Sequence, residues 1–168
     1  WGQRVDAFLL ALIGSVAAFY CAAPWQLASP ELAPRMEIFT GMLVYDPFTI
    51  FLRGVLTGFT LLFVIFTKLS GIPDSEDGPD IYTLVLGATL GMCLMASANH
   101  LLMIFMAVEM ASVPSYVLAG MLKGRKLGSE AALKYSVYGA GAAGVMLYGI
   151  SLIAGLLNTA HLPTLAVR

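Results

Sequence analysis

The sequence predicts an all-α fold, a polytopic bundle of about five transmembrane helices that forms a single membrane domain. Hydrophobic residues make up 59% of the 168 residues and charged residues only 11%. Because a soluble domain carries about 25% charged residues, this composition excludes an ordinary water-soluble protein. It also excludes a disordered chain, which needs high charge and few large apolar residues. The formal net charge of −1 offers no basic surface for nucleic acid.

Long apolar runs are the second observation behind this fold class. A helix needs about 20 mostly apolar residues to cross the hydrocarbon layer of a bilayer. The runs of suitable length cover residues 7–23, 47–67, 81–98, 100–118 and 130–157. The last run is too long for one crossing, so this helix must tilt or protrude at one end.

Residues that begin or interrupt helices separate these runs. Asp46 followed by Pro47 offers an N-cap and a proline at the first helical position. We expect Asp80 to cap the third span and Ser129 to cap the fifth. Residues 68–80 are rich in glycine, proline and acids, which predicts a solvated loop.

The longest connection, residues 24–45, contains the stretch MLVY, which is able to pair as a short strand. Five spans put the two ends of the chain on opposite sides of the membrane. One side then receives most of the basic residues in the connections, namely Arg4, Lys68, Lys123, Arg125 and Lys126, and the other receives Arg35 and Arg168. The positive-inside rule therefore places the N-terminus on the cytoplasmic or equivalent side.

Three ionisable residues lie inside the apolar runs, where a charge costs roughly 2.5–3.5 kcal/mol and marks a functional site by default. Glu109 lies deepest, about 13 Å from either end of its span. Phe105, Ser112 and Tyr116 follow its helical face, and Pro114 frees a backbone carbonyl nearby. We interpret Glu109 as a protonatable carboxylate on a proton path, with an interhelical ion pair as the alternative.

Lys134 lies near the start of the fifth span, and its helical face continues with Tyr138. A short basic connection makes the fourth and fifth spans an antiparallel hairpin, which lets Lys134 approach Glu109 directly or through water. The alternative is that Lys134 reaches the membrane surface. For Arg53, about two turns inside its span, we favour this surface interpretation. The predicted catalytic pair is thus Glu109 and Lys134, and the predicted supporting polar residues are Ser112, Tyr116, Tyr138 and His100.

Other motifs predict structure rather than chemistry. His100 begins the fourth span and is expected to act as a cap or interface residue, and no metal site is predicted. Cys21 and Cys93 lie within apolar runs, so a disulfide is not expected. Residues 139–144 read GAGAAG, a dinucleotide-binding pattern, but here the pattern lies inside a membrane helix. Its small residues, like the pairs Gly54/Gly58 and Gly87/Gly91, allow helices to approach closely.

Three segments together carry a family resemblance. They are NHLLMIFMAVEMASVPSY at 99–116, SEAALKYSVYGAGAAGVMLYGISLIAGL at 129–156 and MLVYDPFTIFLR at 42–53. They are similar to the antiporter-like proton-channel subunits of respiratory complex I, the NADH-quinone oxidoreductase, and most to the subunit N branch, called subunit 2 in mitochondria. The resemblance implies proton translocation coupled to quinone reduction elsewhere. It assigns proton transfer to Glu109 and Lys134.

The resemblance also implies that this chain binds no cofactor, and that partner subunits hold FMN, iron–sulfur clusters and the quinone site. Other complex I membrane subunits and the lipid bilayer are the implied partners, with no nucleic acid and no soluble small-molecule substrate. The implied location is the bacterial inner membrane, or the mitochondrial inner or thylakoid membrane. The family's central pumping lysines fall beyond Arg168, so we expect part of a larger subunit.

Two other functions are compatible with the same residues. One is a membrane scaffold or assembly subunit in which Glu109 and Lys134 form a structural pair. The other is a cation/proton antiporter that acts alone, since such antiporters share this helix pattern.

Overall fold

A computed structural model describes residues 7–22, 35–71, 78–121 and 126–167. This part of the chain is helical apart from one small antiparallel hairpin and the connections. In chain order the elements are α1 (Ala7–Ala22), β1 (Met36–Ile38), β2 (Leu43–Tyr45), α2 (Pro47–Ser70), α3 (Gly78–Ala96), α4 (Leu101–Ala119), α5 (Lys126–Leu157) and α6 (Leu162–Leu165). Each predicted apolar run forms a helix, which confirms the all-α membrane fold class. The predicted strand is present as β2, which pairs with β1 so that Met36 lies opposite Tyr45.

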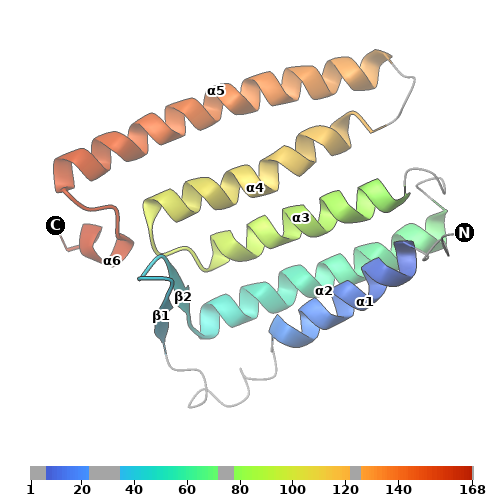
Figure 1. Cartoon of the computed structure of the whole chain (residues 1–168), viewed down its shortest axis with the longest axis horizontal. Coiled ribbons are helices and arrows are strands. Elements are labelled where there is room, and N and C mark those ends of the chain that lie inside the picture. The colour runs from blue at the N-terminus through green and yellow to red at the C-terminus, as the bar shows by residue number, and fades with distance from the viewer. Residues whose placement is uncertain (1–6, 23–34, 72–77, 122–125, 168) are drawn as a thin grey trace, which may run out of the picture.

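The helices α2, α3, α4 and α5 lie in a row in chain order, each antiparallel to the next, and α1 packs against α2 and α3 (Figure 1). The β1–β2 hairpin, the connection at residues 97–100 and α6 gather at one end of the row, which we call the hairpin end. The α1 helix begins at the opposite end. Successive helices run in opposite directions between the two ends of the row, as the sequence predicts.

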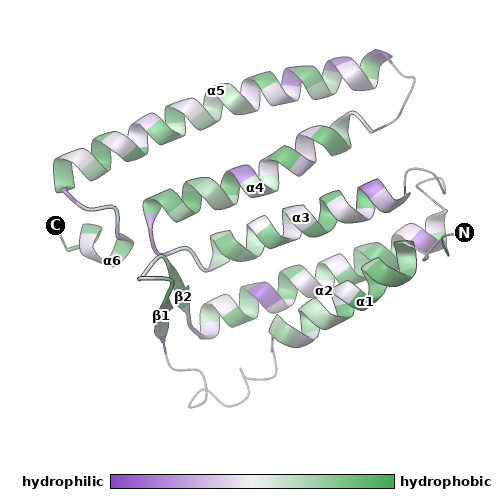
Figure 2. Cartoon of the chain, viewed as in Figure 1, coloured by the Kyte–Doolittle hydropathy of each residue, from purple (hydrophilic) through white to green (hydrophobic). Residues whose placement is uncertain are grey.

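Within the described residues, four helices, α2 to α5, are long and apolar enough to cross a membrane, and α1 is a shorter apolar helix of 16 residues. Figure 2 shows mostly hydrophobic ribbons, with hydrophilic bands near the starts of α3 and α5 and isolated ones within α2 and α4, the helices that contain Arg53 and Glu109. The 32 residues of α5 correspond to about 48 Å, well beyond the ~30 Å hydrocarbon layer. As predicted, this helix is longer than one crossing.

The start of α2 follows the sequence prediction. The backbone N–H of Thr49 donates to Asp46 Oδ1 at 2.8 Å, and the backbone N–H of Asp46 donates to Thr49 Oγ1 at 3.0 Å. Pro47 occupies the first turn, and Gly71 ends the helix in the left-handed conformation with φ of 69°. This reciprocal capping satisfies backbone donors that the first helical turn leaves free.

Two other predicted caps are wrong. The α3 helix begins at Gly78, so Asp80 lies in its first turn, and α5 begins at Lys126, so Ser129 lies inside it. The predicted loop 68–80 is also too long, because 68–70 belong to α2 and 78–80 to α3, while 72–77 fall outside the described residues. Pro79 explains the earlier start of α3, since proline is well tolerated in a first helical turn.

The best-buried packing lies among α1, α2 and α3, where Ala11, Val64 and Tyr82 form a small core. The buried face of α2 is rich in threonine, and most of these hydroxyls donate to a carbonyl one turn earlier in the helix. Thr60 also hydrogen-bonds Thr89 of α3, with 2.8 Å between the two oxygens. Interhelical bonds of this kind help hold membrane helices together, because lipid offers no competing partner.

Candidate functional site

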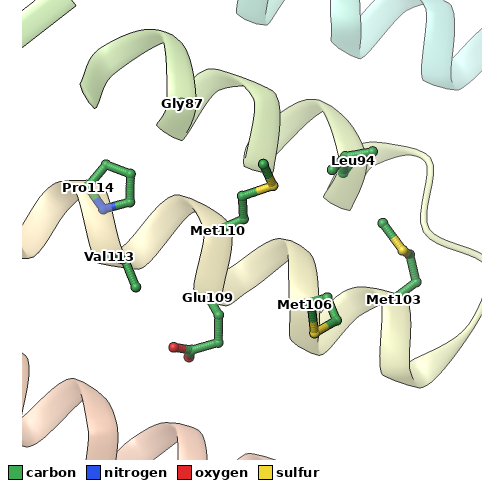
Figure 3. A pocket seen from close by; sticks show the side chains of 8 residues that line it. All are labelled: Gly87, Leu94, Met103, Met106, Glu109, Met110, Val113 and Pro114. Atoms are coloured by element: carbon green, nitrogen blue, oxygen red, sulfur yellow. The ribbon is translucent and has the colours of Figure 1, made fainter. Parts of the chain in front are cut away.

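Glu109 lies near the middle of α4, about 12 Å from its start and 15 Å from its end. Its side chain is half-buried and makes no hydrogen bond or ion pair with any residue that the structure describes. It lines an open, otherwise apolar groove of about 620 Å³ between α3 and α4, together with Gly87, Leu94, Met103, Met106, Met110, Val113 and Pro114. In Figure 3 the carboxylate points away from α3, whereas Met110 and Pro114 point toward it.

Close packing against α3 fixes the turn of α4 that carries Glu109. A Cβ atom on Gly91 would lie only 2.6 Å from the backbone nitrogen of Ala111 and 3.0 Å from the carbonyl oxygen of Ala107. The two backbones are therefore in direct contact, and Ala107 is completely buried. The predicted close approach is thus confirmed at Gly91. At Gly87 the nearest atom is Pro114 Cγ, at an ordinary 3.8 Å.

The other face of α4 meets α5 through side chains. The hydroxyl of Tyr116 occupies the space where a Cβ on Gly139 would lie. The rings of Tyr116 and Tyr135 meet edge to face, with 4.7 Å between their centroids. Ser115 Oγ donates to the Tyr135 hydroxyl at 3.2 Å. We call Ser115, Tyr116 and Tyr135, together with Ser112 one turn before Tyr116 on the same face of α4, the polar seam.

The contacts in the seam set the register of the two helices. Tyr116 lies opposite Gly139, and Gly120 lies opposite Ala132, whose Cβ would be 2.7 Å from a Cβ on Gly120. Lys134 is therefore level with the last turn of α4, about 15 Å along the axis from Glu109. Lys134 instead forms an ion pair with Glu130 one turn earlier, and both side chains are more than half exposed. The structure does not bring Glu109 and Lys134 together, so their direct approach is absent from the described part of the chain.

Of the predicted supporting residues, Ser112 and Tyr116 belong to the polar seam, whereas Tyr138 and His100 do not. Ser112 shares the face of Glu109, and its hydroxyl donates to the Val108 carbonyl at 2.7 Å. Tyr138 is 77% exposed and does not lie in the seam. His100 is the N-cap of α4, where its Nδ1 accepts from the Leu102 N–H at 3.2 Å, which confirms the cap interpretation.

Arg53 is half-buried, and its Nε atom is enclosed by protein without a hydrogen-bond partner among the described residues. Among those same residues, no group of three histidine, cysteine or carboxylate side chains is arranged to hold a metal ion.

The sequence interpretation missed two features of the structure. The seam residues Ser115 and Tyr135 were not singled out, although each adjoins a residue that was, Tyr116 and Lys134. A polar cluster at the hairpin end was also missed. It joins residues 62 positions apart, and no local pattern connects positions so distant.

Comparison with known proteins adds independent information. Residues 98–168, from the α3–α4 connection onward, match the family described as NADH:quinone oxidoreductase/Mrp antiporter, TM. NADH-quinone oxidoreductase subunit N 2 of Chloroherpeton thalassium is 44% identical over 126 residues, which cover 73% of this chain and 25% of that protein. The protein of the same name from Sorangium cellulosum is 38% identical over 164 residues, covering 95% of this chain and 31% of that protein. The chain belongs to the antiporter-like membrane subunits.

A solved structure shares the fold of this antiporter-like chain. The membrane-bound sulfane sulfur reductase, an archaeal respiratory membrane complex, contains a chain that superimposes with a TM-score of 0.83 at 19% identity. The match covers 99% of this chain and 35% of that one. This antiporter-like chain spans about a quarter to a third of the length of the curated relatives named above.

Proposed function

We propose that this antiporter-like chain forms part of a proton-translocating membrane subunit of an NADH:quinone oxidoreductase, and that Glu109 gains and loses a proton on its path. The position of Glu109 carries the proposal. A charged side chain near the bilayer centre costs roughly 2.5–3.5 kcal/mol, and within the described residues no partner offsets this cost. A carboxylate kept at such a cost is a functional site by default.

The polar seam offers a route between Glu109 and Lys134. Ser112 lies one turn beyond Glu109 on the same face, followed by Ser115 and Tyr116. The Ser115–Tyr135 hydrogen bond then crosses to α5, beside Lys134. Each hydroxyl is both a donor and an acceptor, so together with water these groups can pass a proton in steps. A gap of about 15 Å needs such steps, because one hydrogen bond spans about 3 Å.

Electrostatics gives this route a means of control. A cation that approaches Glu109 favours the charged carboxylate, and its withdrawal favours proton uptake. Lys134 is held at a distance by Glu130, so we propose that it acts at the far end of the seam. The Glu109 carboxylate points away from α3 and has no partner among the described residues, so a charged group from the remainder of the subunit can approach it from that side.

The wider assignments follow from the same proposal. We propose that the N-terminal side of α1 faces the cytoplasm or its equivalent, in a bacterial inner, mitochondrial inner or thylakoid membrane. Other membrane subunits of the oxidoreductase are the proposed partners. FMN, iron–sulfur clusters and the quinone site are proposed to belong to those partners rather than to this chain.

The test is Glu109→Gln in the complete oxidoreductase, which keeps the shape of the side chain and removes its proton chemistry. We expect assembly to persist while the number of protons pumped per electron falls. Asp80→Asn in the exposed first turn of α3 is the matched control and should leave pumping unchanged. Unchanged stoichiometry and turnover in Glu109→Gln would remove Glu109 from the path.

A cation/proton antiporter that acts alone is the second candidate, favoured by the family description, which includes Mrp antiporters. Purification distinguishes the two, because such an antiporter comes away without flavin- and iron-containing partners. The described contacts argue against a scaffold held by a Glu109–Lys134 pair, since the register of α4 and α5 offsets the two residues by about 15 Å along the helix axis and Lys134 pairs with Glu130.

A further inference from the structure

A polar cluster ties three separate segments together at the hairpin end. The side-chain amide of Asn99, only 4% exposed, lies between Glu37 of the hairpin and His161 after α5. Its Nδ2 is 3.2 Å from Glu37 Oε1, 3.2 Å from the Gly41 carbonyl oxygen and 3.0 Å from His161 Nε2. We call Glu37, Gly41, Asn99 and His161 the hairpin junction.

Backbone hydrogen bonds also join the three segments that meet at the hairpin junction. The N–H of Leu162 donates to the Asn99 carbonyl at 3.0 Å, and the N–H of Leu101 donates to the Ala160 carbonyl at 2.8 Å. The N–H of Asn99 donates to the Met42 carbonyl at 2.8 Å. The junction therefore connects the start of α4, the segment after α5 and the hairpin.

The groups around Asn99 indicate the state of His161, although the two hydrogens of the Asn99 NH₂ group have three acceptors within 3.2 Å, so one hydrogen is shared between two of them. Two oxygen acceptors face Asn99 Nδ2, so the amide must present its NH₂ group there, not its oxygen. An amide nitrogen cannot accept a hydrogen bond, so His161 Nε2 at 3.0 Å must be the acceptor and carry no proton. The proton of the neutral ring then lies on Nδ1, which donates to Thr164 Oγ1 at 3.0 Å.

A second proton on His161 is incompatible with this arrangement. An imidazolium carries hydrogens on both nitrogens, so Nε2–H would face the NH₂ group of Asn99, donor against donor. The nearest acceptor is Glu37 Oε1, now 3.6 Å from Nε2, and it carries the complementary charge. The ring must therefore turn from Asn99 toward Glu37 when it takes up a proton.

We propose that the hairpin junction is a proton-operated switch, in which His161 accepts from Asn99 when neutral and pairs with Glu37 when charged. Histidine is the side chain that ordinarily changes charge between about pH 5 and 8. The groups that face His161 are Glu37 from β1, Asn99 and the backbone of His100 from the α3–α4 connection, and Thr164 from α6. The switch is independent of Glu109 and its proposed role.

The first test is nitrogen NMR of histidine-labelled complete subunit in lipid nanodiscs, with the His161 signal identified by its loss in His161→Gln. At pH 8 we expect the proton on Nδ1 and a bare Nε2. His100 is the internal reference, because its Nδ1 is an acceptor and its proton lies on Nε2. A protonated Nε2 on neutral His161 overturns the proposal.

The second test uses Glu37→Gln, which keeps the acceptor for Asn99 and removes only the charge. Glu37 is 45% exposed, so this change is compatible with folding. Hydrogen exchange of the Leu162 amide, referenced to an unstructured peptide at the same pH, is the readout. We expect protection to fall by about two- to fivefold at pH 5.5 and to stay unchanged at pH 8.

Two controls sharpen the second test. Asp80→Asn, at the opposite end of the bundle, should leave the Leu162 amide unchanged at both pH values. In a His161→Gln background, Glu37→Gln should lose its effect at pH 5.5. An equal effect of Glu37→Gln at the two pH values, or none at pH 5.5, contradicts the switch.

Discussion

The two faces of α4 are packed by different means, although the same helix carries both. Toward α3 the backbones touch at Gly91, so the contact has no side chain that is free to yield. Toward α5 the contact is a tyrosine ring inserted above Gly139, together with hydroxyl groups. One face therefore fixes the position of Glu109, and the other supplies groups that can exchange protons.

The largest expected effect comes from Gly91→Ala, which disrupts the backbone contact between α3 and α4. The added methyl group meets backbone atoms of α4, so the two helices must separate, and we expect a loss of about 3 kcal/mol in the free energy of unfolding. Thermal unfolding of the complete subunit in nanodiscs measures it. Gly14→Ala is the control, because a Cβ there meets no atom within 4 Å. Equal stability of the two variants would show that the backbone contact is not decisive.

A smaller effect is expected from Gly139→Ala on the adjustable face. The methyl group displaces the end of the Tyr116 side chain rather than a backbone, and we expect a cost of about 1 kcal/mol in the same unfolding measurement. Adding Tyr116→Ala should make the double variant less unstable than the sum of the two single changes. Gly144→Ala, in open space on the same helix, is the control. Additive losses would contradict the contact.

The smallest effect is expected from Tyr135→Phe, which removes only the hydroxyl that Ser115 reaches. One interhelical hydrogen bond in a membrane is worth about 0.6 kcal/mol, so unfolding should change little. If the seam carries protons, however, the pumping rate of the assembled complex should fall well beyond this stability loss. Tyr138→Phe, whose ring is exposed, serves as the comparison. Equal pumping in both variants would exclude Tyr135 from the route.

Local chemistry explains how much could be predicted from the sequence. The apolar runs, the Asp46 cap and the central position of Glu109 depend on neighbours within a few residues, and all three are recovered. The prediction of Asp80 and Ser129 as caps was wrong, because a helix can start wherever the backbone groups of its first turn find hydrogen-bond partners. Pro79 permits the earlier start of α3. The separation of Glu109 from Lys134 depends on the register of two helices, which Tyr116 and Gly139 set. The Asn99 cluster needed the fold itself, because it joins the hairpin to the segment after α5.

The length of α5 has a consequence for the membrane around it. A helix of about 48 Å in a hydrocarbon layer of ~30 Å leaves some 18 Å that must lean or extend into the headgroups. Lipids with longer acyl chains would cover more of the turns near Glu130 and Lys134, and shorter ones would uncover them. Bilayer thickness thus becomes a physical variable that acts on the hydration of Lys134, without touching the carboxylate at the centre of α4.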